Sequence, residues 1–323
     1  MRRVAVSMVL VALSSVVVFA LVAAAGDPTA SLRLDPDIST AQLASRRHEL
    51  HLDEPVAARY IRWVAGVGRG DLGRSLDGRP VRALLWARLQ VTLRMVVAGS
   101  LLGLAGAVLL GAWSAHRPYS WTDHGIAVMA LIVLSVPVFW LGAMLKWYVA
   151  FGVNRVAGHR ILATLGEADP NLAGGLLTRL GNYASHLALP TFALAAVLAG
   201  AWSRYLRASM LEVLGHDHIR AARARGVPEW RLTLGHALGN AVGPFATLVA
   251  VDFAQVLGGV VVLERVFGWH GMGELLIDGV MASDVNVVLA WLLVTASLVV
   301  MANLLADVLL ARLDPRVRLG RAV

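Results

Sequence analysis

The 323-residue chain has no cysteine, a single lysine and few charged residues. Without cysteine there is no disulfide framework and no thiolate metal site. The one lysine, Lys146, lies in an apolar run, so the chain lacks the G-x-x-x-x-G-K-[ST] loop that cradles nucleotide phosphates. Charged residues make up only 15% of the chain and apolar residues 58%, outside the usual balance of soluble globular proteins. The first class to test is therefore an integral membrane protein.

Long apolar runs support this class. Five runs without Lys, Arg, Asp or Glu are long enough, or nearly so, for the ~20 residues that cross a bilayer as a helix. They are residues 4–25, 95–115, 125–145, 180–203 and 285–306, and a sixth run, 241–263, qualifies except for Asp252. The first run resembles a signal peptide, but its 22 uncharged residues exceed the usual apolar region of such peptides. We predict an all-α polytopic membrane protein with six transmembrane helices.

The arginines predict the orientation. The net charge of +8 fits nucleic-acid binding in principle, but in a membrane protein basic residues gather in the cytoplasmic loops. With the N-terminus in the cytoplasm, the inner segments hold Arg2, Arg3, Arg117, six arginines from Arg204 to Arg231, and Arg312, Arg316, Arg318 and Arg321. The short outer loops hold fewer. Both termini are thus expected in the cytoplasm.

The chain divides into three parts on this topology. Residues 1–25 form the first transmembrane helix, 26–90 an extracytoplasmic cap loop with short helices, and 91–323 a core of five transmembrane helices. In the second span Gly99, Gly103, Ala107 and Gly111 share one helix face, which allows close helix packing, either within the chain or against a partner subunit.

Polar residues inside the predicted spans are candidate functional groups. Asp252 lies near the middle of the fifth span, and Gln255 lies on the same face. A carboxyl group there either lines a substrate pathway or makes a structural hydrogen bond to a neighbouring helix, and both interpretations stay open. His48 and His51 have the spacing of a ligand pair, but no third ligand is evident nearby, so we expect no metal site.

The most unusual segment is the arginine-rich stretch that begins "DHIRAARARGVPEWRL" at Asp217. Residues 212–225 favour one helix, Gly226 favours its end, and Pro228 suits the first turn of a second helix. DNA binding is disfavoured because both ends are tied to membrane spans. Binding to lipid headgroups explains the arginines but not the alanines or the break. Docking of a cytoplasmic protein explains the arginines, the alanines and the break between the two helices.

The segment "RAARARG" followed by "VPEWRLTLGHALGNAVGP" resembles the EAA loop of binding-protein-dependent ABC importer permeases, in the oligopeptide and dipeptide subfamily. Further matches are "GDLGRSLDGRPV", "SVPVFWLG", "RYLRASMLEVLGHDHIR", "VVVLERVFGWHGMGELL" and "NLLADVLLARLDPRVR". The resemblance covers nearly the whole chain and implies the MetI-like fold of type I ABC importer permeases. Two departures are Arg220, where the motif has an acidic residue, and Gly239, where many sugar permeases have proline.

The resemblance implies a role for each part of this loop. Residues 207–240 become the coupling loop, whose helices insert into a groove of the ATPase subunit. The residues carried over to the docking helix are Arg220, Ala221, Ala222, Arg223, Gly226, Val227, Pro228 and Glu229.

The implied assembly has two cytoplasmic ATPase subunits, which bind ATP and Mg²⁺, a second homologous permease and an extracytoplasmic peptide-binding (lipo)protein. This chain then sits in the bacterial inner membrane among lipids, with no cofactor or catalytic residue of its own and no nucleic acid. The alternatives are a proton-coupled transporter that uses Asp252 as its relay, and a structural membrane scaffold.

Overall fold

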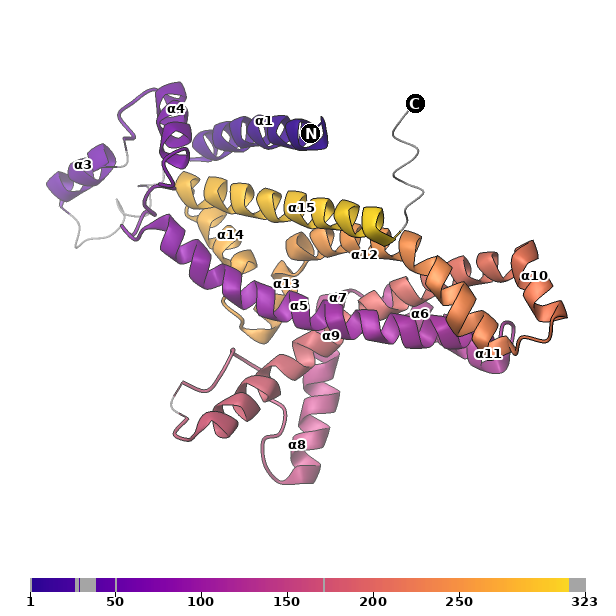
Figure 1. The fold of residues 1–323 in the computed structure, drawn as a ribbon. Helices are drawn as coiled ribbons and strands as arrows, with labels where there is room; N and C mark the ends of the chain where they lie inside the picture. The colour runs from indigo at the N-terminus through magenta and orange to yellow at the C-terminus, as the bar shows by residue number, and fades with distance from the viewer. Residues whose placement is uncertain (1, 27–28, 30–38, 50, 171, 314–323) are drawn as a thin grey trace. The chain divides into compact units, whose positions relative to one another are not determined.

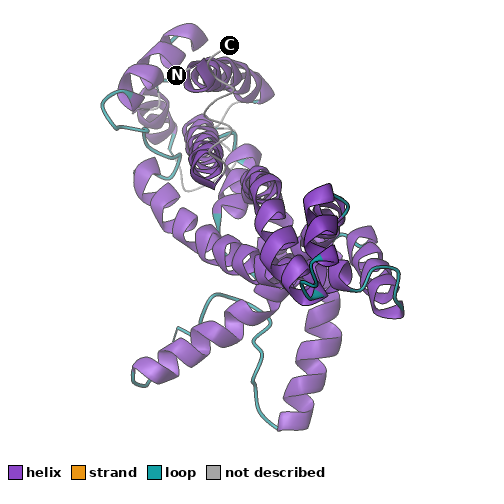
Figure 2. Ribbon diagram, turned by 45° about the vertical axis from the view of Figure 1, so that its right-hand side comes forward, coloured by secondary structure: helices purple, strands orange, loops and turns teal. Residues whose placement is uncertain are grey.

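The structure, a computed structural model, describes residues 2–26, 29, 39–49, 51–170 and 172–313. Its regular elements are helices (Figures 1 and 2), and within the described ranges the only bridge between extended segments joins Arg74 to Pro80. The expected all-α class is confirmed. Helices dominate because the lipid core offers no water to satisfy the backbone, so each apolar segment must satisfy it internally.

The helices follow one another along the chain as α1 (Arg2–Ala25), α3 (Thr40–Glu49), α4 (Val56–Val67), α5 (Val81–His116), α6 (Trp121–Ser135), α7 (Val138–Met144), η1 (Leu145–Ala150), α8 (Phe151–Ala157), α9 (Leu176–Leu214), α10 (Asp217–Ala224), α11 (Glu229–Arg231), η2 (Leu232–Ala237), α12 (Leu238–Gly259), α13 (Val261–Phe267), α14 (Met272–Met281) and α15 (Val285–Leu313). The segments η1 and η2 are π-helical turns within longer helices.

The chain forms two compact units. Unit 1 consists of Met1–Thr92 and His270–Val300, and unit 2 of Leu93–Trp269 and Met301–Val323. Arginines beyond residue 313, which entered the charge count, lie outside the described residues.

Unit 1 ties the cap segment to two apolar helices. Phe19 of α1 is buried with Val285 and Leu289 of α15, and Tyr60 and Trp63 of α4 pack against this cluster. The rings of Phe19 and Tyr60 meet edge to face with centroids 5.3 Å apart. Aromatic side chains therefore fix α4 across the ends of α1 and α15.

Unit 2 is built around α9, which packs against α6, α7 and α12 and fully buries Trp202, Leu206 and Met210. The small-residue face of α5 lies directly on α9. A Cβ atom added to Gly99 would come within 2.6 Å of a Leu194 side-chain atom. The small residues Gly99, Gly103, Ala107 and Gly111 were expected to pack either within the chain or against a partner subunit, and this contact is packing within the chain. Membrane helices gain stability from such close van der Waals contact.

Four helices are long and apolar enough to span a membrane: α5, α9, the helix Glu229–Phe253 and α15 over Val285–Leu305. A bent pair, Trp121–Ser135 with Val138–Ala157, would make a fifth. The apolar part of α1, Met8–Ala24, is shorter, so the sixth span stays a prediction.

The third span is not the straight helix over 125–145 that the apolar run predicted. Its two parts meet at an angle of 101°. Val136 is extended, with φ −101° and ψ 128°, since proline at 137 disfavours a helical conformation in the residue before it. Pro137 directly precedes α7 as its N-cap residue, and it has no N–H that could be left unpaired there.

Candidate functional site

The segment between α9 and η2, residues 215–231, is called the elbow here. The predicted single helix over 212–225 is wrong, because α9 ends at Leu214 and α10 begins only at Asp217. Gly215 closes α9, and its N–H donates to the carbonyl oxygens of Leu211 and Glu212. His216 is extended, with φ −72° and ψ 151°, and so changes the direction of the chain.

The predicted helix end at Gly226 is confirmed. Gly226 has φ +83°, a left-handed conformation that glycine adopts without a steric penalty. Its N–H donates to the carbonyl oxygen of Arg223 at 2.9 Å, and the N–H of Val227 donates to that of Ala222 at 3.2 Å. This is the Schellman pattern that satisfies the last carbonyls of a helix. Pro228 directly precedes α11 instead of lying in its first turn.

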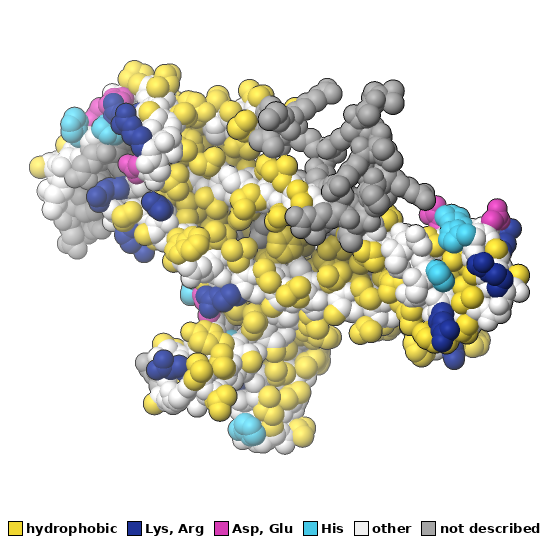
Figure 3. All heavy atoms as spheres, viewed as in Figure 1, with side chains coloured by type: hydrophobic (Ala, Val, Ile, Leu, Met, Phe, Trp, Pro, Cys, Tyr) yellow, Lys and Arg dark blue, Asp and Glu magenta, His cyan; other side chains and the backbone are white. Residues whose placement is uncertain are grey.

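The helix α10 has a buried face and an exposed face. Ile219 and Ala222, three residues apart, are buried where α10 packs against α9 and η2. The exposed face presents small alanines between arginines: Arg220, Ala221, Ala224 and Arg225. Figure 3 shows basic side chains gathered at this end of unit 2, whereas the visible surface along α5 and α6 is largely apolar.

An ion pair closes the elbow. The Arg223 guanidinium donates from Nε to Glu229 Oε1 at 2.5 Å and from Nη2 to Oε2 at 3.1 Å. The hydrogen bond to Glu229 raises the pKa of Arg223 above its ordinary value. Because both side chains are exposed, the ion pair contributes little to the stability of the fold, but it links α10 to α11 across the turn.

Sequence reasoning missed a second cluster that supports the elbow. Asp123 of α6 is almost fully buried and accepts two hydrogen bonds from Arg207 of α9, at 2.7 and 2.6 Å. Ser114 of α5 also donates to Asp123, as does the backbone N–H of Tyr119 at 2.7 Å. The only local signal was Ser120, which caps α6 by accepting from the N–H of Asp123. The cluster joins α5, α6 and α9 two turns before α9 ends.

A further contact reaches η2 from the end of α5. His116 Nδ1 lies 3.2 Å from the hydroxyl of Thr233, which is buried and donates to the carbonyl oxygen of Glu229 at 2.9 Å. The helices on both sides of α10 are therefore held by polar contacts to the rest of unit 2.

Asp252 of α12 accepts a hydrogen bond from the indole N–H of the buried Trp202 at 2.7 Å. This is the hydrogen bond to a neighbouring helix that the structural interpretation requires. Gln255 is exposed. The two residues and the elbow occupy different parts of unit 2, and no group of three potential metal ligands was found among the described residues.

The fold and the elbow define a class: a multi-pass helical membrane protein with a short, exposed basic helix held between two long apolar helices. The chain belongs to the family described as binding-protein-dependent transport system inner membrane component, whose model matches residues 107–319. The N-terminal model of the same transport-system membrane components matches residues 1–80. As a membrane permease component, the chain has a transport role and not an enzymatic one.

The chain is similar along almost its whole length to known permeases. It is 42% identical over 320 residues to the oligopeptide transport system permease protein OppB of Mycobacterium tuberculosis, covering 99% of this chain and 98% of that one. It is 36% identical to AppB, an oligopeptide transport system permease of Bacillus subtilis, and 34% identical to the dipeptide permease DppB of Escherichia coli K12, covering 91% of this chain and 90% of the relative in each case.

The solved structures support the fold. A chain of the MetNI methionine ABC transporter, in an inward-facing conformation, matches with a TM-score of 0.55 at 16% identity, covering 72% of this chain and 97% of that one. The predicted MetI-like ABC importer permease fold is thereby confirmed.

Proposed function

We propose that the chain is the permease subunit of an ATP-driven importer of peptides, forming the translocation pathway with a second, homologous permease. The permease relatives named for oligopeptide and dipeptide transport, at 34–42% identity, support peptides as the substrate class. In this proposal an extracytoplasmic binding protein delivers the peptide, and two cytoplasmic ATPase subunits bind ATP and Mg²⁺.

The elbow is the proposed docking site for an ATPase subunit. This proposal rests on the exposed face of α10, where small alanine side chains lie between arginines. Small side chains permit close insertion into a groove, and the arginines suit an acidic rim. The docking residues proposed are Arg220, Ala221, Ala222, Arg223, Gly226, Val227, Pro228 and Glu229, with Ala222 acting from the buried face.

Force applied to α10 would reach the membrane helices through its contacts. Ile219 and Ala222 pack α10 on α9 and η2, and the Arg223–Glu229 pair joins it to α11. Closure of the ATPase pair would therefore move α9 and α12 together with α10. Such coupled movement switches the pathway between outward and inward openings.

Three further assignments belong to this proposal. Both termini and the elbow face the cytoplasm. The chain is organised as residues 1–25, 26–90 and 91–323, with 207–240 as the coupling loop. Asp252 and Gln255 are candidates for the wall of the pathway, and the hydrogen bond from Trp202 would hold the Asp252 carboxylate in one orientation.

The absence of cysteine gives a direct test. Ala221→Cys introduces a unique thiol on the exposed face of α10, and Gly175→Cys introduces one just before α9, where nothing lies within 4 Å of an added Cβ. With the complex assembled in cells, we expect Ala221→Cys to crosslink to the ATPase subunit and to resist a membrane-impermeant maleimide added outside. Gly175→Cys should show the reverse behaviour.

Labelling of Ala221→Cys from outside intact cells would reject the cytoplasmic orientation. Labelling from inside without any crosslink to the ATPase would reject the docking assignment. Uptake that continues without ATP and stops when a protonophore is added would favour the proton-coupled alternative.

A further inference from the structure

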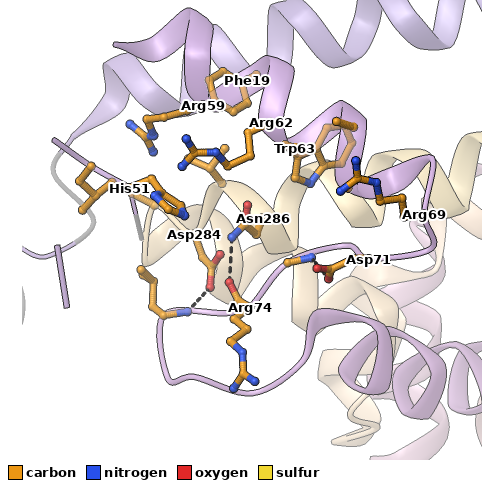
Figure 4. A pocket seen from close by; sticks show the side chains of 17 residues that line it. Phe19, His51, Arg59, Arg62, Trp63, Arg69, Asp71, Arg74, Asp284 and Asn286 are labelled. Atoms are coloured by element: carbon orange, nitrogen blue, oxygen red, sulfur yellow. Dashed lines mark hydrogen bonds between the residues drawn. The ribbon is translucent and has the colours of Figure 1, made fainter. Parts of the chain in front are cut away.

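Unit 1 contains a cavity of about 450 Å³ lined by α4, the loop that follows it and the start of α15. Its apolar wall includes Phe19, Trp63 and Val285. Cationic side chains also line it: Arg59, Arg62, Arg69 and Arg74, with His51 beside them. Figure 4 shows Arg59 and Arg62 extending to one side of the cavity and Arg69 lying beside Trp63, whereas the guanidinium of Arg74 points away.

The carboxylates of the cavity already have partners. Asp284 accepts hydrogen bonds from the Ser75 hydroxyl at 2.8 Å and from the N–H of Leu76 at 2.7 Å. Asp71 accepts from the N–H of Gly73 at 2.9 Å. Neither carboxylate forms an ion pair with the arginines of the cavity.

Three of the arginines, Arg59, Arg69 and Arg74, form no ion pair among the described residues, and the guanidinium of Arg74 points away from the cavity. Arg62 pairs with Glu54 at 2.7 Å, but neither Arg59 nor Arg69 forms an ion pair there. Arg59 instead lies over the ring of Phe19, 5.9 Å from its centroid. Burial lowers the pKa of the Arg59 guanidinium, and the charge of Glu54 offsets this only in part. A bound anion would compensate a charge that burial destabilises.

The cavity lies at the ends of apolar helices. Val285 begins the apolar segment Val285–Leu305, and Phe19 lies in the last two turns of the apolar part of α1. On the nearby α4, Val56, Ile61 and Val64 are exposed apolar residues. Aromatic and arginine side chains at such a position are typical of the boundary between hydrocarbon and lipid headgroups. Phospholipid headgroups carry phosphate oxygens at that boundary, and basic pockets between membrane helices can bind such headgroups.

We propose that this cavity binds the headgroup of an anionic phospholipid. Arg59 and Arg69 provide positive charge to its oxygens, and the apolar wall of Phe19, Trp63 and Val285 contacts the apolar part nearest the headgroup. The lipid would fasten α4 to the ends of α1 and α15. A peptide carboxylate matches the charge but not the apolar wall at the level of the bilayer surface. This site is independent of the proposed docking of an ATPase at the elbow.

The test uses the full-length chain, co-expressed and purified with its partner subunits, in nanodiscs of phosphatidylcholine with or without phosphatidylglycerol. After gentle delipidation, native mass spectrometry counts the phosphatidylglycerol molecules retained. Each arginine near a charged bilayer surface contributes about 1 kcal/mol, so the double variant Arg59→Gln/Arg69→Gln should weaken retention about tenfold to thirtyfold. The double variant Arg82→Gln/Arg179→Gln also removes two positive charges, both from exposed positions outside the cavity, and should retain the lipid as the wild type does.

Several outcomes would overturn the proposal. Equal retention by the double variant and the wild type would show that the lipid binds elsewhere. Equal retention of phosphatidylcholine would show that charge is not recognised. Displacement by inorganic phosphate would indicate a free-anion site, and displacement by a peptide with a free carboxylate, but not by its amide, would indicate a cargo site. The variant Arg59→Lys keeps the charge and should retain the lipid, which separates loss of charge from misfolding.

Discussion

Replacement of Gly226 by aspartate is the sharpest test of the elbow. At φ +83°, a residue other than glycine costs about 1–2 kcal/mol. No atom lies within 4 Å of the Cβ position, so the new side chain meets no internal clash. The hydrogen bonds that end α10 use backbone atoms and can persist. Since folded domains are stable by about 5–15 kcal/mol, the variant should still fold and insert.

The expected loss lies in docking. The new carboxylate would stand at the exposed end of α10, where the proposed groove must close, and it would compete with Glu229 for Arg223. An unpaired charge buried at an interface costs about 2–5 kcal/mol, which corresponds to a loss of affinity of roughly thirtyfold or more. We therefore expect Gly226→Asp to abolish ATP-driven peptide uptake in proteoliposomes and to lose the ATPase subunits during purification.

Two controls separate strain from charge. Gly226→Asn introduces similar strain without charge and should keep part of the uptake. Gly175→Asp places the same carboxylate before α9, also without any neighbour within 4 Å, and should transport normally. Wild-type uptake by Gly226→Asp, with the ATPase subunits retained, would refute docking at this position. Equal loss in Gly226→Asn with the ATPase still bound would assign the effect to strain.

Three further predictions concern the membrane helices. Asp252→Asn keeps an acceptor for the Trp202 N–H, so we expect an unchanged thermal unfolding midpoint but an altered peptide affinity or transport rate. Unchanged transport would favour a structural role alone. Asp123→Ala removes the partner of Arg207 and should lower the free energy of unfolding by about 3–5 kcal/mol, measured as a lower unfolding midpoint in detergent. An unchanged midpoint would contradict a structural role for the pair. Gly103→Ala would bring a Cβ within 2.9 Å of the Leu198 Cβ on α9 and should destabilise the purified chain by about 1–3 kcal/mol in the same assay. An unfolding midpoint equal to that of the wild type would contradict this prediction.

The sequence predicted much of the elbow because its signals are local. The end of α10 at Gly226 follows from the conformational freedom of one residue. The break after Leu214 also lies at a glycine, Gly215, but this residue keeps a helical φ of −78°, so a glycine in the sequence does not by itself tell how or where a helix ends. The bend before Pro137 carried a local signal in the proline, but the apolar run was treated as one continuous span.

The sequence by itself determined the class of the protein, its helical character and the family, because bilayer thickness requires long apolar helices and the motifs occur in order along the chain. Only the tertiary structure decided which polar groups meet. Asp123 and Arg207 are 84 residues apart, and Trp202 and Asp252 are 50 residues apart. The cavity arginines likewise face a wall built from α1 and α15. Such contacts depend on how helices pack, and no local propensity encodes that packing.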